Sequence, residues 1–201
     1  LAQQSPAHQQ VLEQLFANTP LMVQMLVADG AIWGKYGQAM ELYNEIQQAS
    51  DQANDGILQR LAVAVAITHA VPFKQQNPEV MTDGPEFIDP IKRYLSYEKA
   101  YLNGELDPSF ADQCTWGLKM VVGTWYPDET IAWGREMFRA YRPDLLRATL
   151  DEGRYVNIVD NEISYTSKRV KLDNPELHQM QNILDNGGIC GRRAFFARFL
   201  L

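Results

Sequence analysis

The feature that most constrains this chain is a run of seven consecutive apolar residues, Leu61 to Ile67, inside a helical segment. The segment follows Asp55-Gly56, a helix-start signal, and it must end before Pro72, because a residue that precedes proline avoids helical geometry. A helix that is apolar on every side has to be covered on every side by other elements. The run is much shorter than the roughly 20 residues that cross a bilayer. It therefore predicts the central buried helix of a globular domain.

The segments on either side have the spacing of helices that cover such a centre. Apolar residues recur every three or four positions in residues 33–49. A capping residue followed by proline marks helix starts at Thr19-Pro20, Asp89-Pro90 and Asp107-Pro108. Further helices are predicted over residues 10–17, from Pro127 onward and over residues 175–184. The sequence therefore predicts a mainly α fold, a multi-helix globular bundle.

Two segments depart from the helical pattern. Three prolines interrupt residues 72–89, which predicts an irregular surface connection, and loops of that length in compact domains are usually functional. Residues 154–166 fit short strands, although a helix also fits them. The apolar residues that allow strands there are Val156, Ile158, Ile163 and Tyr165.

The charge balance is acidic, with 25 acidic and 18 basic residues and a net charge of −7. A nucleic-acid-binding domain usually gathers basic residues into a patch, so we expect no nucleic-acid partner. The sequence has no Cys-x-x-Cys or His-Glu-x-x-His spacing, so no metal or cofactor is predicted. No transmembrane segment or signal peptide is visible. A chain that starts at Leu1 rather than Met suggests a processed or trimmed product. The compartment is left open, with an extracytoplasmic space or an organelle lumen among the options.

The chemistry of the sequence is concentrated around Cys190, which follows a double glycine and opens a helical pattern. Unsatisfied backbone N–H groups and the helix dipole favour a thiolate at a helix start. Gly187 and Gly188 would let the backbone turn tightly and approach a substrate, and Arg193 would add positive charge. An anion site at Arg192, Arg193 and Arg198 is less favoured than a solvated helix face. With Cys114 the chain can form at most one disulfide, and we favour two reduced thiols, one of them buried.

The pattern Gly188-x-Cys190-x-x-x-Ala194, followed by Phe195 and Phe196, resembles the nucleophile segment of the transglutaminase-like superfamily. Residues 127–137, 141–144 and 155–167 look like the helical region that precedes this segment in some bacterial members. The resemblance implies a papain-like fold with its cysteine at the start of a buried helix. It divides the chain into a helical domain, 1–153, and the start of a transglutaminase-like α+β module, 154–201. It also implies acyl transfer or amide hydrolysis on a protein or peptide, with Cys190 as catalytic nucleophile and its backbone N–H as an oxyanion donor.

The family's mechanism needs a histidine and an aspartate placed after the cysteine. The histidines of this sequence, His8, His69 and His178, all precede Cys190. We expect His8 in the terminal tail, His69 as a packed or capping residue, and His178 on an exposed helix face.

Two interpretations stay open. In the first, the catalytic module continues in a longer chain, which would also cover the apolar end Phe199-Leu200-Leu201. In the second, the protein is a non-catalytic helical interaction or structural subunit that docks through residues 72–89 and the apolar C-terminal helix, with a partner subunit covering that helix.

Overall fold

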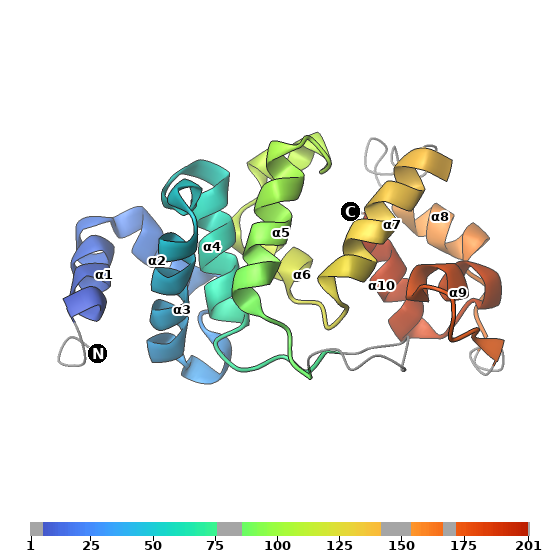
Figure 1. The fold of residues 1–201 in the computed structure, drawn as a ribbon, viewed down its shortest axis with the longest axis horizontal. Helices are drawn as coiled ribbons and strands as arrows, with labels where there is room; N and C mark the ends of the chain where they lie inside the picture. Colours follow the sequence, from blue (N-terminus) through green and yellow to red (C-terminus); the bar gives the residue numbers. More distant parts are fainter. Residues whose placement is uncertain (1–5, 76–85, 142–153, 167–171, 201) are drawn as a thin grey trace. The chain divides into compact units, whose positions relative to one another are not determined.

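The protein is described by a computed structural model that covers residues 6–75, 86–141, 154–166 and 172–200 (Figure 1). These residues are mostly helical, so the predicted mainly α, multi-helix fold is confirmed. The chain forms two compact units. Unit 1 comprises residues 1–74 and 87–125, and unit 2 comprises residues 75–86 and 126–201. The predicted domain boundary between residues 153 and 154 falls within unit 2 and stays a prediction.

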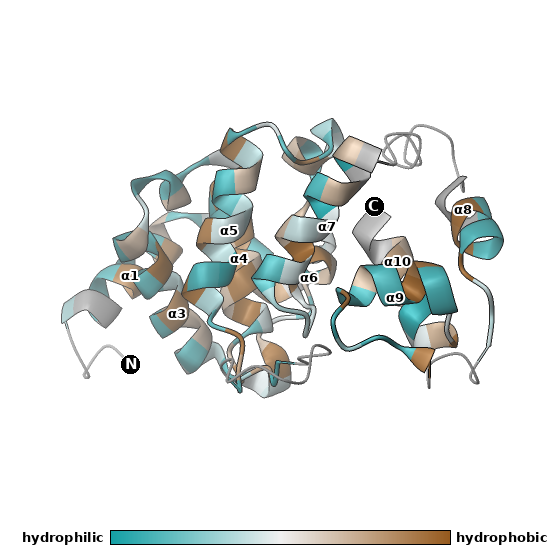
Figure 2. Cartoon of the chain, turned by 45° about the vertical axis from the view of Figure 1, so that its right-hand side comes forward, coloured by the Kyte–Doolittle hydropathy of each residue, from teal (hydrophilic) through white to brown (hydrophobic). Residues whose placement is uncertain are grey.

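The predicted central helix is α4 (Gly56–Thr68), which the Asp55 carboxylate caps by accepting a hydrogen bond from the Gly56 N–H at 2.7 Å. Every side chain from Leu61 to Ile67 is fully buried, as an apolar circumference requires. The cover comes from α2 (Thr19–Val27), α3 (Tyr36–Ala49), α5 (Pro90–Leu102) and α6 (Thr115–Val122), all of which contact α4. Figure 2 shows the hydrophobic colouring of α4 among these helices.

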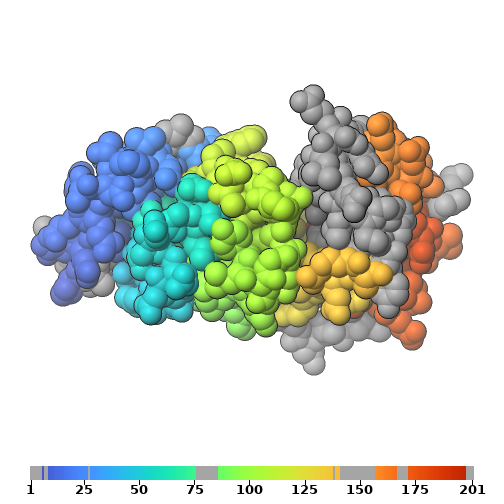
Figure 3. All heavy atoms as spheres, turned by 90° about the horizontal axis from the view of Figure 1, so that it is seen from above, coloured from blue at the N-terminus to red at the C-terminus, as the bar shows by residue number. Residues whose placement is uncertain are grey.

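Helices that are neighbours in the sequence also pack together in unit 1. The first helix, α1 (Pro6–Ala17), packs on α2 and α3, and Figure 3 shows unit 1 running in sequence from blue α1 to green α5. Asn18 caps α2 and Asp89 caps α5, each through a side-chain oxygen that accepts backbone N–H groups. Proline is the second residue of α2 and the first residue of α5. The capping residue of α2 is therefore Asn18, one position before the predicted Thr19.

The predicted helix over residues 33–49 begins late. Residues Ile32–Gly34 form a 3₁₀ turn in which Trp33 has φ 53° and is 80% exposed, and α3 starts only at Tyr36. A positive φ at Trp33 and again at Gly34 cannot continue a right-handed helix. The apolar spacing that included Trp33 was therefore coincidental at this position.

The predicted helix from Asp107 is also divided. A 3₁₀ helix covers Pro108–Asp112, and α6 starts at Thr115 after Gln113 and Cys114 adopt extended geometry. The Arg60 side chain of α4 donates to the carbonyl oxygens of Ala111 (2.8 Å) and Gln113 (3.0 Å). These carbonyls at the break are satisfied by a distant arginine rather than by a continuing helix.

The described ends of the segment 72–89 are irregular, as predicted, and they approach each other. Lys74 and Phe87 form an isolated antiparallel bridge, and the Ile88 N–H donates to the Phe73 carbonyl at 2.9 Å. Residues 76–85 of the predicted connection lie outside the described residues.

Unit 2 contains α7 (Asp128–Tyr141), α8 (Arg154–Glu162), α9 (Gln179–Asn186) and α10 (Cys190–Leu200). Helix α10 packs against α8 and α9, and α7 packs against α9. Their shared core consists of the buried side chains Val159, Ile163, Met180, Ile183 and Phe196. The predicted start of α7 after Pro127 is confirmed, and so is the helix that begins at Cys190.

The strands allowed over residues 154–166 are absent, because this segment is mainly α8. Val159 and Ile163 lie four positions apart, share one buried face, and are joined by a helical hydrogen bond of 3.0 Å. Only Tyr165 takes part in a parallel bridge, with Gly188. Within the described residues the bridges are isolated and no strand forms, so the β part of the predicted α+β module stays a prediction.

Candidate active-site cysteine at the start of α10

The turn that leads into Cys190 is fixed by its two glycines. Gly187 ends α9 with φ 67° and ψ −152°, a conformation that is essentially restricted to glycine, and its N–H donates to the Ile183 carbonyl at 2.8 Å. Gly188 then pairs with the segment around Tyr165, donating to the Ser164 carbonyl at 3.0 Å and accepting from the Thr166 N–H at 3.2 Å.

The space beside both glycines is occupied by other atoms of the protein. A Cβ on Gly187 would lie 2.1 Å from the Ser164 carbonyl oxygen, and one on Gly188 would lie 2.5 Å from Cδ of Arg192. Both residues are buried. The prediction that they let the backbone approach a substrate is therefore wrong, since they let two segments of the protein approach each other.

Open space lies one residue later. Cys190 and Gly191 are exposed, and a Cβ on Gly191 would meet no atom within 4 Å. The Ile189 carbonyl accepts the N–H groups of Arg192 (3.1 Å) and Arg193 (3.2 Å), which closes the first turn of α10. The N–H groups at the very start of a helix have no acceptor within it. Cys190 thus combines an exposed thiol, a helix N-terminus and an unobstructed side.

The two arginines after Cys190 hold parts of the protein together. Arg193 donates to the Ile163 carbonyl at 2.7 Å, pairs with Asp160, and lies 5.6 Å from the centre of the Tyr165 ring. Arg192 pairs with Asp173, with Nη1 3.0 Å from Oδ1. Their side chains are only 13% and 18% exposed for Arg192 and Arg193 respectively.

These pairings change the predicted electrostatics. Asp160 compensates the positive charge that Arg193 was expected to add near the thiol. The favoured interpretation of a solvated face is also wrong for Arg192 and Arg193, because both are mostly covered and ion-paired. The side chain of Arg198 lies outside the described residues.

His178, the histidine nearest to Cys190 in the sequence, lies at the start of α9. His178 is the capping residue of α9, where its backbone N–H donates to the Gln181 side chain at 3.1 Å, and its ring stacks on Trp133 with centroids 4.3 Å apart. The prediction that it lies on an exposed helix face is wrong. Cys190 follows the opposite end of this helix of eight residues, which is about 12 Å long at the usual rise. His178 and Cys190 therefore lie beyond opposite ends of α9.

The other two histidines belong to unit 1. His69 ends α4 and is 5% exposed, which confirms a packed and capping role. Its Nε2 lies 3.3 Å from the Val122 carbonyl oxygen, and this carbonyl can only accept, so Nε2 carries the proton. Burial, helped by the nearby Arg93 charge, lowers the His69 pKa to about 4. His8 lies in α1, so the prediction that it belongs to a terminal tail is wrong, and its side chain is outside the described residues.

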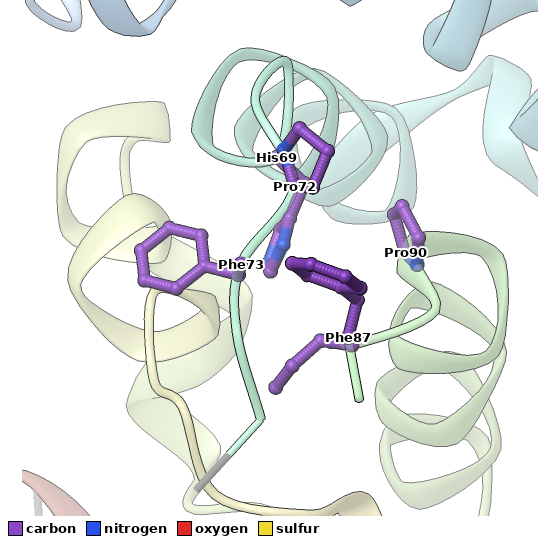
Figure 4. A pocket seen from close by; sticks show the side chains of 6 residues that line it. His69, Pro72, Phe73, Phe87 and Pro90 are labelled. Carbon is purple, nitrogen blue, oxygen red and sulfur yellow. The ribbon is translucent and has the colours of Figure 1, made fainter. Parts of the chain in front are cut away.

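His69 also lines a pocket of about 320 Å³, whose lining residues include Pro72, Phe73 and Phe87 (Figure 4). The His69 ring lies 5.1 Å from the Phe73 ring, between centroids. The Nδ1 atom of His69 has no hydrogen-bond partner and no exposed surface. The wall that the pocket offers to a bound molecule is mainly apolar.

Both cysteines are free, and both are exposed. The prediction that one is buried is wrong, because Cys114 immediately precedes α6 at the surface just as Cys190 opens α10. Among the described residues no group of His, Cys, Asp and Glu side chains is suited to hold a metal ion. Within the same residues no helix has the length and apolar character needed to span a membrane.

Sequence reasoning missed the residues that surround the Cys190 turn. Asp160, Ser164 and Asp173 all contact this turn or its arginines, the first two from the end of α8 and the third from the segment before α9. The predicted helix start at Asn174-Pro175 is wrong, since α9 begins only at Gln179, and that prediction concealed the ion pair of Asp173. Only the folded arrangement brings these residues together.

Comparisons with protein-family models, with curated proteins and with solved structures found no match for this chain.

Proposed function

We propose that this chain carries the nucleophile segment of a transglutaminase-like cysteine module. In this proposal Cys190 performs acyl transfer or amide hydrolysis on a protein or peptide substrate. The observation that carries the proposal is the exposed Cys190 thiol at the first residue of α10, beside the open space at Gly191. The resemblance of the Gly188-x-Cys190-x-x-x-Ala194 pattern supports the same assignment.

The surroundings of Cys190 suit a covalent reaction on an amide. The thiolate sulfur attacks the substrate carbonyl carbon, a C–S bond forms, and the C–N bond breaks as the leaving amine takes up a proton. Water or a second amine then attacks the thioester, which returns the thiol and releases an acid or a new amide. The N–H groups at the start of α10 are the donors available to the developing oxyanion.

The proposal requires a base, and the two histidine side chains that the structure describes are engaged elsewhere. His178 lies at the far end of α9, and His69 is buried in unit 1. Under this proposal a histidine and an orienting aspartate come from outside residues 1–201, in the same polypeptide or in a partner.

The test compares the two exposed thiols of the natural full-length protein. Both are alkylated with iodoacetamide near pH 7, and the labelling of each cysteine is followed by peptide mapping. Cys114, exposed beside the start of α6, is the internal control. We expect Cys190 to react about tenfold faster or more, as an activated thiolate does. Equal rates would remove the proposed nucleophile. A Cys190→Ala variant should also lose incorporation of a labelled primary amine into peptides.

A second candidate function is a non-catalytic interaction subunit that docks through residues 72–89. The observation that favours it is the pocket at the described base of this segment, where Phe87 is 45% exposed. The described part of α10 lends it no support, because Phe196 is buried and Phe195 stacks on Tyr126 within unit 2. In this case Cys190→Ala would leave assembly intact and Phe87→Ser would weaken it. Loss of function in a folded Cys190→Ala protein would contradict it.

A further inference from the structure

We propose that Arg192 is a positioning residue that holds the turn before Cys190 in its reactive geometry. This inference rests on the proposed function of Cys190. It assigns Arg192 a mechanical role, in place of the supply of positive charge that its position near the thiol suggests.

Arg192 contacts both glycines of the turn. Its Nη1 lies 3.3 Å from the Gly187 carbonyl oxygen, and its side-chain carbons fill the space beside Gly188 where a Cβ would otherwise stand. Its own backbone N–H donates to the Ile189 carbonyl at 3.1 Å. One residue thus braces the three positions that immediately precede Cys190.

Asp173 fixes the guanidinium in turn. The carboxylate binds both terminal nitrogens of Arg192, and its Oδ1 also accepts from the Asn186 side chain at 3.4 Å. A bidentate pair of this kind sets the direction of the guanidinium as well as its position. Asp173 therefore ties the Arg192 brace to the end of α9.

The residues after Asp173 are anchored by a buried amide. Asn182 of α9 exchanges hydrogen bonds of 2.9 Å with the backbone N–H and carbonyl of Asn174, and it also donates to the Leu177 carbonyl at 3.2 Å. Asn182 is 3% exposed, so a buried side chain holds these partly buried bonds. The support runs without interruption from α9 through Asp173 and Arg192 to the Cys190 turn.

The ion pair separates a mechanical role from an electrostatic one. Removing the Asp173 carboxylate leaves the Arg192 charge near Cys190 uncompensated. It also frees the guanidinium to take other orientations. If Arg192 acts by charge, Asp173→Asn makes Cys190 more reactive, because positive charge favours a thiolate. If Arg192 acts by position, Asp173→Asn makes Cys190 less reactive, as Arg192→Gln does. The two roles predict opposite signs for one substitution.

The experiment uses the natural full-length protein and its Arg192→Gln, Arg192→Lys and Asp173→Asn variants. Asp185→Asn is the matched control, since it removes one exposed carboxylate close to the same turn. Two quantities are measured for each protein. The first is the pH profile of Cys190 alkylation by iodoacetamide, and the second is amide hydrogen exchange at Gly188 and Thr166, the donors of the bridge around Tyr165.

We expect Arg192→Gln and Asp173→Asn both to slow alkylation at neutral pH and to speed exchange at Gly188 and Thr166 several-fold. Arg192→Lys should be intermediate, and Asp185→Asn should match the wild type. Faster alkylation in Asp173→Asn, or unchanged exchange in Arg192→Gln, would overturn the positioning role. The proposed function fails separately, if wild-type Cys190 reacts no faster than Cys114 while the exchange results stand.

Discussion

Arg93 and His69 share one hydrogen-bond acceptor, the carbonyl oxygen of Val122 at the end of α6. Nη1 of Arg93 lies 2.9 Å from this oxygen, and Nε2 of His69 lies 3.3 Å from it. Both side chains are buried, so a charged and a neutral donor meet in the interior of unit 1. A positive charge on His69 would stand beside the charge of Arg93 in this buried site. Burial, together with the nearby Arg93 charge, therefore keeps the imidazole neutral by lowering its pKa.

The first prediction is that His69 makes the protein less stable in acid. Its pKa is about 4 in the folded chain and near 6.5 in the unfolded chain, so the unfolded chain binds the additional proton between these values. The contribution to the free energy of unfolding is complete above pH 6.5 and declines as the pH falls toward 4. The loss attributable to His69 is at most roughly 3 kcal/mol. Urea unfolding at several pH values measures it.

The matched variant for this prediction is His69→Gln, whose amide can still donate to the Val122 carbonyl but does not titrate. Its unfolding free energy should fall less steeply than that of the wild type between pH 6.5 and 4. Parallel curves for the two proteins would mean that His69 is protonated in the fold as easily as in the unfolded chain.

The second prediction concerns the fully buried Arg93, whose Nη1 also donates to the Thr124 carbonyl at 3.0 Å. Arg93→Met keeps much of the side-chain volume but removes the Arg93 donor from the Thr124 carbonyl and leaves the Val122 carbonyl with the His69 donor. We expect a loss of about 2–4 kcal/mol in unfolding free energy, measured by urea denaturation. The control is Lys92→Met, whose ion pair with Asp89 is exposed and 4.0 Å long, and which should change stability little. Similar losses in both variants would argue against a special role for the buried guanidinium.

The sequence predicts much of the helical framework because local rules govern it. An all-round apolar circumference identifies α4, and a capping aspartate followed by proline identifies the start of α5. His69 could be placed correctly because it follows the apolar run directly. The start of α10 at Cys190 was likewise predictable from the double glycine before it.

The errors arise where distant residues decide the outcome. Arg60 satisfies carbonyls at the break before α6, although it lies 53 residues before Gln113. Arg192 and Asp173 are 19 residues apart, and no spacing rule joins them. The roles of Gly187 and Gly188 depend on the positions of the Ser164 carbonyl and the Arg192 side chain. A turn signal in the sequence could not show whether the glycines make room for these groups or for a substrate.

The third prediction contrasts two glycines on either side of Cys190. Gly187→Ala places a Cβ 2.1 Å from the Ser164 carbonyl oxygen in a backbone conformation that alanine avoids. We expect a loss of stability of about 1–3 kcal/mol or more. Gly191→Ala meets open space in a helical position and should be neutral or stabilising by up to about 1 kcal/mol.

Thermal unfolding of the two variants decides this prediction. If Gly191→Ala keeps stability yet slows the alkylation of Cys190, the open space beside the thiol is needed for access. A stable Gly187→Ala protein would show that the turn can adopt another conformation.

The final prediction concerns Asn182, the buried amide that anchors residues 174–177 to α9. Asn182→Leu approximates its size but removes two donors and one acceptor, so the Asn174 N–H and the carbonyls of Asn174 and Leu177 lose their partner. We expect a loss of about 2–3 kcal/mol in unfolding free energy, because these backbone groups are partly buried. Amide exchange at Asn174 should accelerate in the same variant. Asp185→Leu, an exposed change on the same helix, should leave both measurements close to wild type. Because Asn182 also supports Asp173, Asn182→Leu should slow Cys190 alkylation as Asp173→Asn does. An unchanged rate would show that Asn182 does not help to position Cys190.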